Sequence, residues 1–526
     1  MAIPSLSSAA NASPPGTILL EDRRASHTEL ILSPTPSDDP DDPLNWSPLR
    51  KGVNFTLTCS YVCFTFVLVD INSLAYRGYI AELGLTYATF NMAAGSNFIG
   101  LALGCLLFLP CVHKLGRRPV YLLSAITQFA CAVWWANFHS AGELIGVSLL
   151  AGLAGSISEA VVMITIVDLF FVHQHARFNG VFVFMQSLGT TGGPIACGYI
   201  VVDLGWRWMW WIVAILLGVN LVLVLFFFEE SKYVPSLNGQ STFAPGNEAI
   251  MAHPKDGRDT HPATPIASQT STTAPRRSQK SIRQRLAFVT KTPGPIFQHF
   301  YQPLLVLVSF PAVAYTAVTY GTILAFFSAT SSAGSYFLIY PPYNFSPSAI
   351  GLFHLGGFIG ALLATLLMSP LIDWTIVRLA RRNNGVFEPE MRLWMGIPAA
   401  LVNCAAMLGL HWAILAFAQG LFGFGFITAA DVALTYLSDC YPDILADALI
   451  AVVFIRNGFA ATIRFAFTDW LEAMGIRDTF ILIGVIAIVS GALPIALLIY
   501  GKRARVWTAQ RYKVFSGRQW GRRGAV

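Results

Sequence analysis

The feature that most constrains this chain is a series of apolar stretches, each about as long as the hydrocarbon core of a bilayer is thick. A helix needs roughly 20 apolar residues to cross that core. Twelve windows of this length can be placed: 53–72, 88–109, 119–138, 144–167, 180–201 and 209–228, and, after a polar interval, 303–327, 349–370, 394–411, 413–437, 446–467 and 479–500. With 55% hydrophobic and 12% charged residues, the chain is too apolar for a soluble globular domain. We therefore expect an all-α membrane protein with twelve transmembrane helices in two six-helix halves.

The polar segments divide the chain into five parts. Residues 1–51 are rich in Ser, Pro and Asp, which predicts a disordered cytoplasmic N-terminus. The two apolar halves are expected at 52–233 and 301–500. The interval 234–300 is basic and rich in Ser, Thr and Pro, which is typical of a flexible cytoplasmic linker. Residues 501–526 are expected to form a basic cytoplasmic tail.

The distribution of cations predicts which helix ends face the cytoplasm, because Lys and Arg are retained on that side during insertion. With both termini inside, 29 of the 34 Lys and Arg residues fall in cytoplasmic segments. Only three, Arg77, Arg207 and Arg477, fall outside. The acceptor sequence that begins at Asn344 then lies on the outer face, which makes Asn344 a candidate for glycosylation, although Pro347 follows the acceptor serine and disfavours its use.

The fifth apolar window contains small residues at a distinctive spacing. Glycines remove side chains from one helix face and permit close approach of a neighbouring helix, while a proline releases a backbone carbonyl. The residues are Gly180, Gly189, Gly193, Pro194 and Gly198. This pattern resembles the antiporter motif on the fifth helix of proton-coupled exporters in the major facilitator superfamily, with Cys197 where the family usually has a further glycine. The alternative interpretation is that small residues simply help a membrane helix to pack.

Further motifs resemble a fungal branch of the drug:proton antiporter group with twelve helices. They are Asp42-Pro43-Leu44-Asn45-Trp46-Ser47 before the first helix, Asp168-Leu169-Phe170-Phe171-Val172-His173 after the fourth, Glu229-Glu230-Ser231-Lys232-Tyr233 after the sixth, and Glu388-Pro389-Glu390-Met391-Arg392-Leu393 after the eighth. The resemblance runs from about residue 40 to residue 500. It implies the major facilitator fold and secondary transport.

The loop between the second and third windows resembles the superfamily's most widespread signature, which latches the cytoplasmic side when the carrier faces outward. The matching residues are Lys114, Gly116, Arg117 and Arg118. His113 stands where the family has an aspartate, and this leaves the charge pairing of the latch open. Asp168, at the inner end of the fourth helix, and Asp373, at the equivalent place in the second half, are the further latch residues that we expect.

Ionisable side chains inside the bilayer cost at least about 2–3 kcal/mol and are functional candidates by default. The carboxylates are Glu159, Asp70 and Asp431, and the intramembrane cations are Arg456 and Arg464. Glu159, near the middle of the fourth helix, is our first choice for proton coupling, because desolvation favours the protonated form of a carboxyl group. For Arg456 two interpretations stay open: an ion pair with Asp431 on the adjacent helix, or direct contact with substrate.

These observations predict a secondary transporter, and specifically a proton-coupled exporter of a small organic molecule such as a drug, toxin or secondary metabolite. Two alternatives stay open: proton-coupled uptake of a nutrient or polyamine, and a membrane receptor that keeps the fold without transporting. The receptor is kept open by His113 and by Ser148, which stands where the family usually has an arginine in the fourth helix. No Walker motif occurs, so ATP-driven pumping is not expected.

The expected partners are a small-molecule substrate, protons and the lipid bilayer. We expect no enzyme activity, no cofactor, no metal and no nucleic acid, and we expect the chain to act as a monomer. The expected location is the plasma membrane, with the vacuolar or a vesicle membrane as the alternative.

Overall fold

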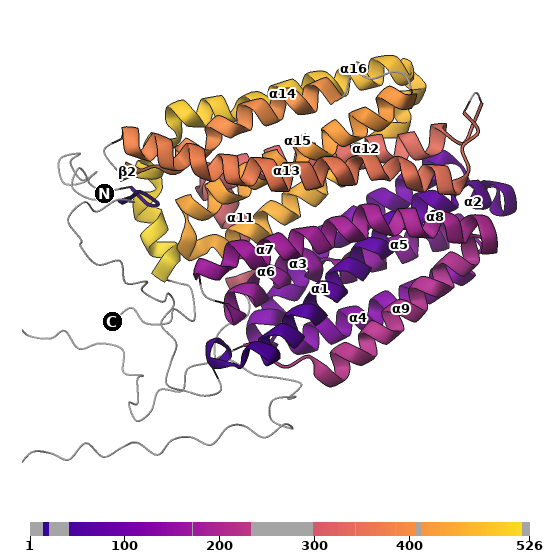
Figure 1. The fold of residues 1–526 in the computed structure, drawn as a ribbon, viewed down its shortest axis with the longest axis horizontal. Helices are drawn as coiled ribbons and strands as arrows, with labels where there is room; N and C mark the ends of the chain where they lie inside the picture. The colour runs from indigo at the N-terminus through magenta and orange to yellow at the C-terminus, as the bar shows by residue number, and fades with distance from the viewer. Residues whose placement is uncertain are drawn as a thin grey trace, which may run out of the picture.

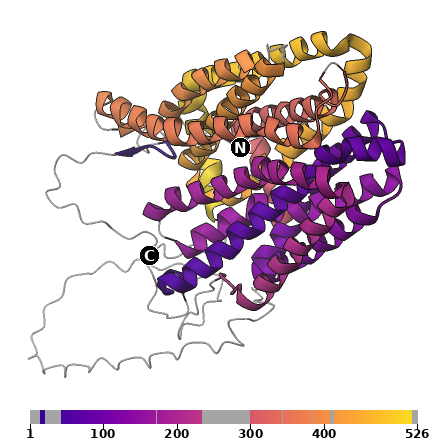
Figure 2. The ribbon, with the colours of Figure 1, turned by 45° about the vertical axis from the view of Figure 1, so that its right-hand side comes forward.

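A computed structural model describes residues 14–19, 42–170, 172–232, 298–341, 343–383, 386–406 and 412–517 of the 526-residue chain. Within these residues the protein is a bundle of helices that run along a common long axis (Figure 1). The N-terminal half, in indigo and magenta, and the C-terminal half, in orange and yellow, lie side by side as two groups of helices (Figure 2). The two-halved, all-α architecture predicted from the apolar windows is confirmed.

The N-terminal half begins several of its helices at a hydroxyl-bearing residue. It contains α1 (Pro48–Asp70), η2 (Ile71–Ala75), α2 (Tyr76–Leu83), α3 (Tyr87–Leu115), α4 (Arg118–Asn137), α5 (Ala141–Gly155), α6 (Ile157–Leu169), α7 (Val172–Ser187), η3 (Leu188–Gly192), α8 (Gly193–Leu204) and α9 (Trp206–Phe227). Ser47, Thr86 and Ser140 accept hydrogen bonds from first-turn amides of α1, α3 and α5, which otherwise lack a partner within the helix. A short segment, η1 (Pro43–Asn45), precedes α1.

The C-terminal half repeats this plan with longer helices. It contains α11 (Gln298–Ser309), α12 (Pro311–Phe337), α13 (Pro347–Arg382), β2 (Val386–Phe387), η4 (Pro389–Met395), α14 (Gly396–Ala406), α15 (Trp412–Cys440), η5 (Pro442–Ile444) and α16 (Leu445–Gly517). At the start of α13, the Ser346 hydroxyl accepts from the Ala349 amide at 3.2 Å, and Pro347 fills the first position, where no amide donor is needed.

The described helices account for twelve crossings of the membrane. Nine helices of the described chain are each long and apolar enough to cross a bilayer. The longest of them, α16, contains two crossings, because Gly475 has a φ of +77° and separates one helix from the next. The fifth crossing is divided into α7 and α8 by η3, a π-helical turn, and the ninth crossing begins with α14, after which residues 407–411 lie outside the described part.

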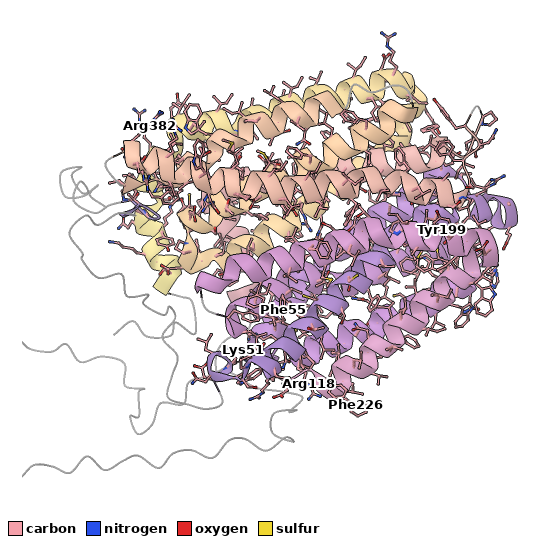
Figure 3. All side chains as sticks on the ribbon, in the orientation of Figure 1. Lys51, Phe55, Arg118, Tyr199, Phe226 and Arg382 are labelled. Carbon is pink, nitrogen blue, oxygen red and sulfur yellow. The ribbon has the colours of Figure 1, made fainter. Side chains whose placement is uncertain are left out.

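The charged helix ends identify the two faces of the bundle. Figure 3 shows Lys51, Arg118 and Arg382 toward one end and Tyr199 toward the other. The three cations belong to segments predicted to be cytoplasmic, so we call their end the inner end and the opposite end the outer end. Asn344 is exposed in the loop between α12 and α13, and its glycosylation stays a prediction.

The two halves repeat one close helix–helix packing. In the N-terminal half, a Cβ atom on Gly100 of α3 would overlap the Leu149 carbonyl of α5. In the C-terminal half, a Cβ atom on Gly423 of α15 would lie 2.6 Å from the Gly357 carbonyl oxygen of α13. Such backbone-to-backbone contact requires glycine. The second and fourth helices of each half therefore form equivalent pairs, as expected for the internal repeats of transporter folds.

The predicted ends of the chain need correction. Disorder throughout 1–51 is wrong for two segments: residues 42–51 pack against the N-terminal half, and residues 14–19 include β1 (Ile18–Leu19), which pairs with β2. The basic tail is not separate from the last helix, because α16 continues to Gly517. The predicted linker lies outside the described residues up to 297.

Candidate functional site

Glu159 and Arg456 form an ion pair between the two halves. Glu159 belongs to the first turn of α6 and Arg456 to α16, and Arg456 Nη2 contacts Glu159 Oε1. Only 7% of the Glu159 side chain and 5% of the Arg456 side chain are exposed. A buried pair is costly to separate, because each charge would lose its partner in a medium of low dielectric constant. The pair therefore links the two halves electrostatically.

Three further residues complete the surroundings of this pair. Asn457 Nδ2 donates a hydrogen bond to Glu159 Oε2 at 2.8 Å. The Arg456 guanidinium lies over the ring of Tyr320 in α12, 4.8 Å from the ring centroid. Gly321 leaves room for this approach, since a Cβ atom there would lie 3.1 Å from Arg456 Cα. Arg456 Nε has no acceptor among the described residues, so this buried donor is available to a water molecule or a substrate.

The halves touch each other on both sides of the ion pair. Toward the outer end, the rings of Tyr87 and Tyr336 stack with centroids 4.2 Å apart. Toward the inner end, Cys105 of α3 shares a buried cluster with Ile450 and Val453 of α16. Because contacts lie both outside and inside it, the pair is shielded from water at both ends in this conformation.

Of the two interpretations left open for Arg456, the ion pair with Asp431 is wrong, because the counter-ion of Arg456 in the structure is Glu159. The sequence places each residue at a depth in the membrane but does not show which helix face it occupies, and the partner belongs to the other half of the chain. Asp431 is half-buried in α15. Arg464 is buried, and its Nη1 donates to the Ser328 carbonyl at 3.4 Å.

Asp70 is the third ionisable group of this region. It is the last residue of α1, and its side chain forms a hydrogen bond with Thr190 of η3. Asp70 and Glu159 are also close enough to interact electrostatically. The structure thus brings two of the three predicted carboxylates and one of the two predicted cations into one neighbourhood and links them to helix five.

Helix five packs against α1 through its glycines. A Cβ atom on Gly189 would overlap the Cys63 carbonyl oxygen. A Cβ atom on Gly193 would lie 2.8 Å from Val67 Cγ2. Both glycines lie in or next to η3, where the backbone widens into a π-helical turn, a feature that is frequent at functional sites.

The outer part of helix five packs against the other half. A Cβ atom on Gly198 would lie 2.8 Å from the Pro347 carbonyl oxygen of α13, and one on Gly351 would lie 2.7 Å from the Pro194 carbonyl oxygen. The contact is therefore reciprocal. Gly180 is different, because a Cβ atom there would have no atom of the described residues within 4 Å, so its expected role in close packing stays a prediction.

At the inner end of the N-terminal half, Arg117 and Asp168 form an ion pair, and the carboxylate of Glu230 contacts the same loop. Arg117 Nε donates to Asp168 Oδ2 at 2.9 Å, so Asp168 provides the pairing that His113 left open. The Glu230 carboxylate accepts from the Arg117 amide at 2.9 Å. Gly116 has a φ of +111°, and a Cβ atom there would meet the same carboxylate. The motif that contains Glu230 is visible in the sequence, but its contact with the latch is not.

Two other predicted latch residues contact the segment after α9. The Arg118 amide donates to Glu230 at 3.1 Å, and Lys232 Nζ donates to the Lys114 carbonyl at 3.2 Å. Burial, together with the nearby charge of Arg117, lowers the pKa of the Lys232 ammonium to about 8. Lys232 therefore titrates near neutral pH at the edge of the latch.

The latch of the C-terminal half is centred on Arg392. Its Nε donates to the Asp439 carboxylate at the inner end of α15. Asp373 lies 3.7 Å from Arg392 but is 76% exposed, so it contributes little. Asp439, which the sequence motifs did not identify, thus occupies the place that Asp168 has in the first half.

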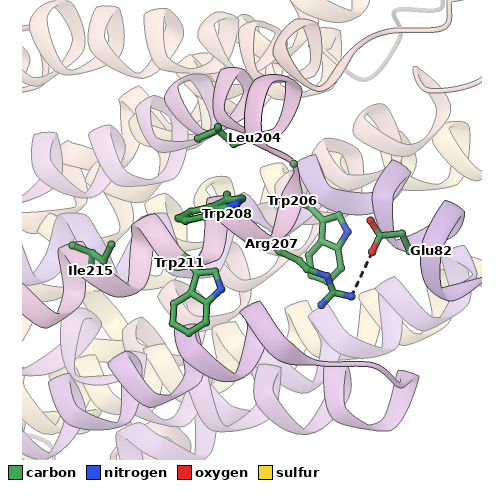
Figure 4. A pocket seen from close by; sticks show the side chains of 8 residues that line it. Glu82, Leu204, Trp206, Arg207, Trp208, Trp211 and Ile215 are labelled. Atoms are coloured by element: carbon green, nitrogen blue, oxygen red, sulfur yellow. Dashed lines mark hydrogen bonds and ion pairs between the residues drawn. The ribbon is translucent and has the colours of Figure 1, made fainter.

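A groove of about 600 Å³ lies at the outer membrane interface, away from the ion pair. It is lined by Glu82, Leu204, Gly205, Trp206, Arg207, Trp208, Trp211 and Ile215 (Figure 4). Arg207 Nη2 lies 3.4 Å from the Glu82 carboxylate, and the guanidinium also lies over the Trp206 ring. Exposed tryptophans at this level are typical of interfacial anchoring.

Comparison with known proteins supports this description of the chain. The sequence profile of the Major Facilitator Superfamily matches residues 54–464. An uncharacterized MFS-type transporter of Schizosaccharomyces pombe is 29% identical, with 95% of this chain and 94% of the relative covered. Protein HOL1 of Saccharomyces cerevisiae is 26% identical, with 94% of each covered. Efflux pump radE of Floropilus chiversii is 25% identical, with 93% of this chain and 87% of the relative covered.

Solved structures show the same fold. The human organic anion transporter MFSD10 (TETRAN) superposes with a TM-score of 0.53 at 15% identity, with 85% of this chain and all of that chain covered. The peptide transporter POT in complex with sulfate superposes with a TM-score of 0.56 at 12% identity, with 87% of this chain and 96% of that chain covered.

Proposed function

Because the chain belongs to the major facilitator superfamily, we propose that it exports a small organic molecule in exchange for protons, with Glu159 as the residue that couples the two. Membership of the family makes the chain a multi-pass membrane transporter. The direction, the coupling and the substrate class are our proposals, and so is its location in the plasma membrane.

The observation that carries the proposal is the buried ion pair between the halves. Glu159 belongs to one half and Arg456 to the other, so movement of the halves apart must break the pair. Breaking a buried pair without replacement leaves two uncompensated charges, which typically costs several kcal/mol. A proton on Glu159 removes its charge, and a substrate group that binds the carboxylate replaces Arg456. The attraction between Glu159 and Arg456 that opposes opening is therefore lost when Glu159 holds a proton or a substrate.

This arrangement makes the proton and the substrate competitors for one carboxylate, which is the condition for exchange. A substrate with an amine or hydroxyl donor would bind Glu159 on the inner side, and a proton arriving from the outer side would displace it. In the empty carrier, Arg456 and Asn457 occupy the carboxylate. A substrate that binds Arg456 instead would travel together with the proton, so an oxygen-rich anion would favour uptake over export.

Helix five supports the export direction. Its glycines resemble the antiporter motif of proton-coupled exporters, and they hold it against α1 and against α13 of the other half. Thr190 of η3 bonds to Asp70, next to Glu159. A movement of the halves along the packing surface of helix five would thus change the contacts of the coupling carboxylates. The printed name of one relative, efflux pump radE, agrees with this direction.

The test is an untargeted comparison of secreted metabolites from host cells that express the chain, the Glu159→Gln variant or neither. We expect at least one compound to accumulate outside cells with the unchanged chain and to remain inside in the other two. Glu472→Gln, a substitution at an exposed carboxylate of α16, is the matched control and should export normally. Surface abundance of each variant must be equal. Depletion of a compound from the medium by the unchanged chain would overturn export and support uptake.

A further inference from the structure

A short piece of the N-terminal region lies on the inner end of the C-terminal half. Residues Ile18 and Leu19 form β1, which pairs antiparallel with β2, in the register Ile18 to Phe387 and Leu19 to Val386. Figure 2 shows this indigo strand beside the inner end of the orange helix α13. The segment thus lies on the C-terminal half, although residues 42 onward belong to the N-terminal half.

The buried cation Arg505 of α16 holds the segment from one side. Its Nη1 donates to the Pro15 carbonyl at 2.6 Å and to the Thr17 hydroxyl at 3.2 Å. Its Nε and Nη2 donate to the two carboxylate oxygens of Glu390 at 2.8 and 2.6 Å. Only 1% of the Arg505 side chain is exposed. Nε and Nη2 of Arg505 therefore bind Glu390, whereas Nη1 binds the segment.

Gly16 fits a position that admits no other residue. Its φ is +81°, which residues with a Cβ rarely adopt, and a Cβ atom there would overlap the Asp439 carbonyl and lie 3.1 Å from Cys440 Cα. The two prolines before it have restricted φ angles, so less conformational freedom is lost when they are fixed. The sequence Pro-Pro-Gly-Thr is thus suited to this surface through its backbone shape as well as its hydrogen bonds.

We infer that the inner end of the C-terminal half carries a docking groove for an extended peptide, formed by β2, Arg505 and the end of α15, and that residues 14–19 of the same chain are its strap. The strap connects three elements that are distant in sequence. It lies directly against Asp439, whose carboxylate pairs with Arg392, so it also covers the latch of this half.

The strap explains a difference between the two latches. In the N-terminal half, Glu230 follows α9 directly and accepts from the amides of the latch loop. In the C-terminal half, the carboxylate belongs to the loop itself: Glu390 of η4 accepts from Arg505 of α16, and Arg505 also donates to the strap. The first latch is contacted only by its own half among the described residues, whereas the second is also contacted by a peptide from the other end of the sequence. Loss of the strap should therefore loosen the inner end of the C-terminal half alone.

Cross-linking tests the identity of the occupant. Directly opposed residues of an antiparallel pair have Cα atoms about 4.5–5.5 Å apart, a distance that a disulfide can bridge. The double variant Ile18→Cys/Phe387→Cys of the full-length protein should form an intramolecular disulfide on oxidation, identified by mass spectrometry of the linked peptides. The control pair Ile18→Cys/Lys114→Cys places the second cysteine on the N-terminal half and should not. Equal yields, or a linked dimer in place of the linked monomer, would overturn the strap.

Hydrogen exchange of the full-length protein in nanodiscs tests what the strap does. In Gly16→Ala, amides of residues 386–395 and 436–441 should exchange about tenfold faster, which corresponds to about 1.4 kcal/mol of lost local stability. Amides of residues 228–232, the segment that contacts the first latch, should be unchanged. Gly52→Ala is the matched control, since a Cβ atom at that helical position meets no described residue within 4 Å. Exchange in Gly16→Ala that equals the Gly52→Ala control would show that the segment does not hold the latch.

Discussion

Replacement of Gly189 by alanine is expected to force helix five away from α1. The added Cβ atom would overlap the Cys63 carbonyl oxygen and lie 2.8 Å from Phe66 Cβ, whereas ordinary van der Waals contacts of a Cβ atom begin at 3.4 Å. A backbone oxygen cannot rotate aside as a flexible side chain can, so the helices must separate. Overpacking of this kind costs about 1–3 kcal/mol. Because Thr190 next to it bonds to Asp70, the displacement should also impair transport.

Gly180→Ala is the matched control for this experiment. It places the same methyl group in the same transmembrane helix, where no atom of the described part of the chain lies within 4 Å. The greater helix propensity of alanine should leave this variant as stable as the unchanged protein, or more stable by up to about 1 kcal/mol. Thermal unfolding of the purified proteins in one detergent should therefore separate the two variants by about 1–4 kcal/mol. Equal melting temperatures and equal transport would refute the packing role of helix five.

Two further predictions concern the inner latch and the topology. The pKa of Lys232 is lowered from 10.5 to about 8 in the folded protein, chiefly by burial. Between these pH values, Lys232 keeps its proton in the unfolded chain and loses it in the folded protein. The free energy of unfolding should therefore rise with pH from about 8 to 10.5. The melting temperature should rise across this pH range in the unchanged protein and should rise less in Lys232→Gln. An equal rise in the two proteins would contradict the prediction. Tags at residues 1 and 526 should resist protease added outside intact cells while a tag at 344 is cleaved, and cleavage of either terminal tag would contradict the charge asymmetry.

The number and depth of the helices were predictable because a membrane-spanning helix is encoded locally. An apolar run of sufficient length is read without knowledge of its neighbours, which is why every window overlaps a described helix. The boundaries are less accurate, since α12 begins eight residues after the seventh window and α13 continues twelve residues beyond the eighth. The charged residues were identified for the same reason, since a carboxylate such as Glu159 stands out in an apolar window. The latch loop was also found, because a glycine among cations is a local pattern.

The partners of these residues were not predictable because they depend on tertiary contacts. Arg456 was identified from its apolar surroundings, but its partner lies 297 positions earlier in the sequence and in the other half. Glu230 stands in a visible motif, yet only the fold brings it to the amides of Arg117 and Arg118. The strap was missed because a strand of two residues gives no periodic signal, and the polar composition around it predicts disorder.

The most direct test of the proposed coupling is transport in reconstituted vesicles, with the compound identified by the metabolite comparison. For the unchanged protein, an imposed pH gradient should drive accumulation of that compound against its own gradient. Glu159→Gln keeps the shape and the hydrogen-bonding oxygen but cannot exchange a proton, so it should retain substrate exchange at equal pH and lose accumulation driven by the gradient. Gradient-driven accumulation by Glu159→Gln equal to that of the unchanged protein would exclude Glu159 as the coupling residue.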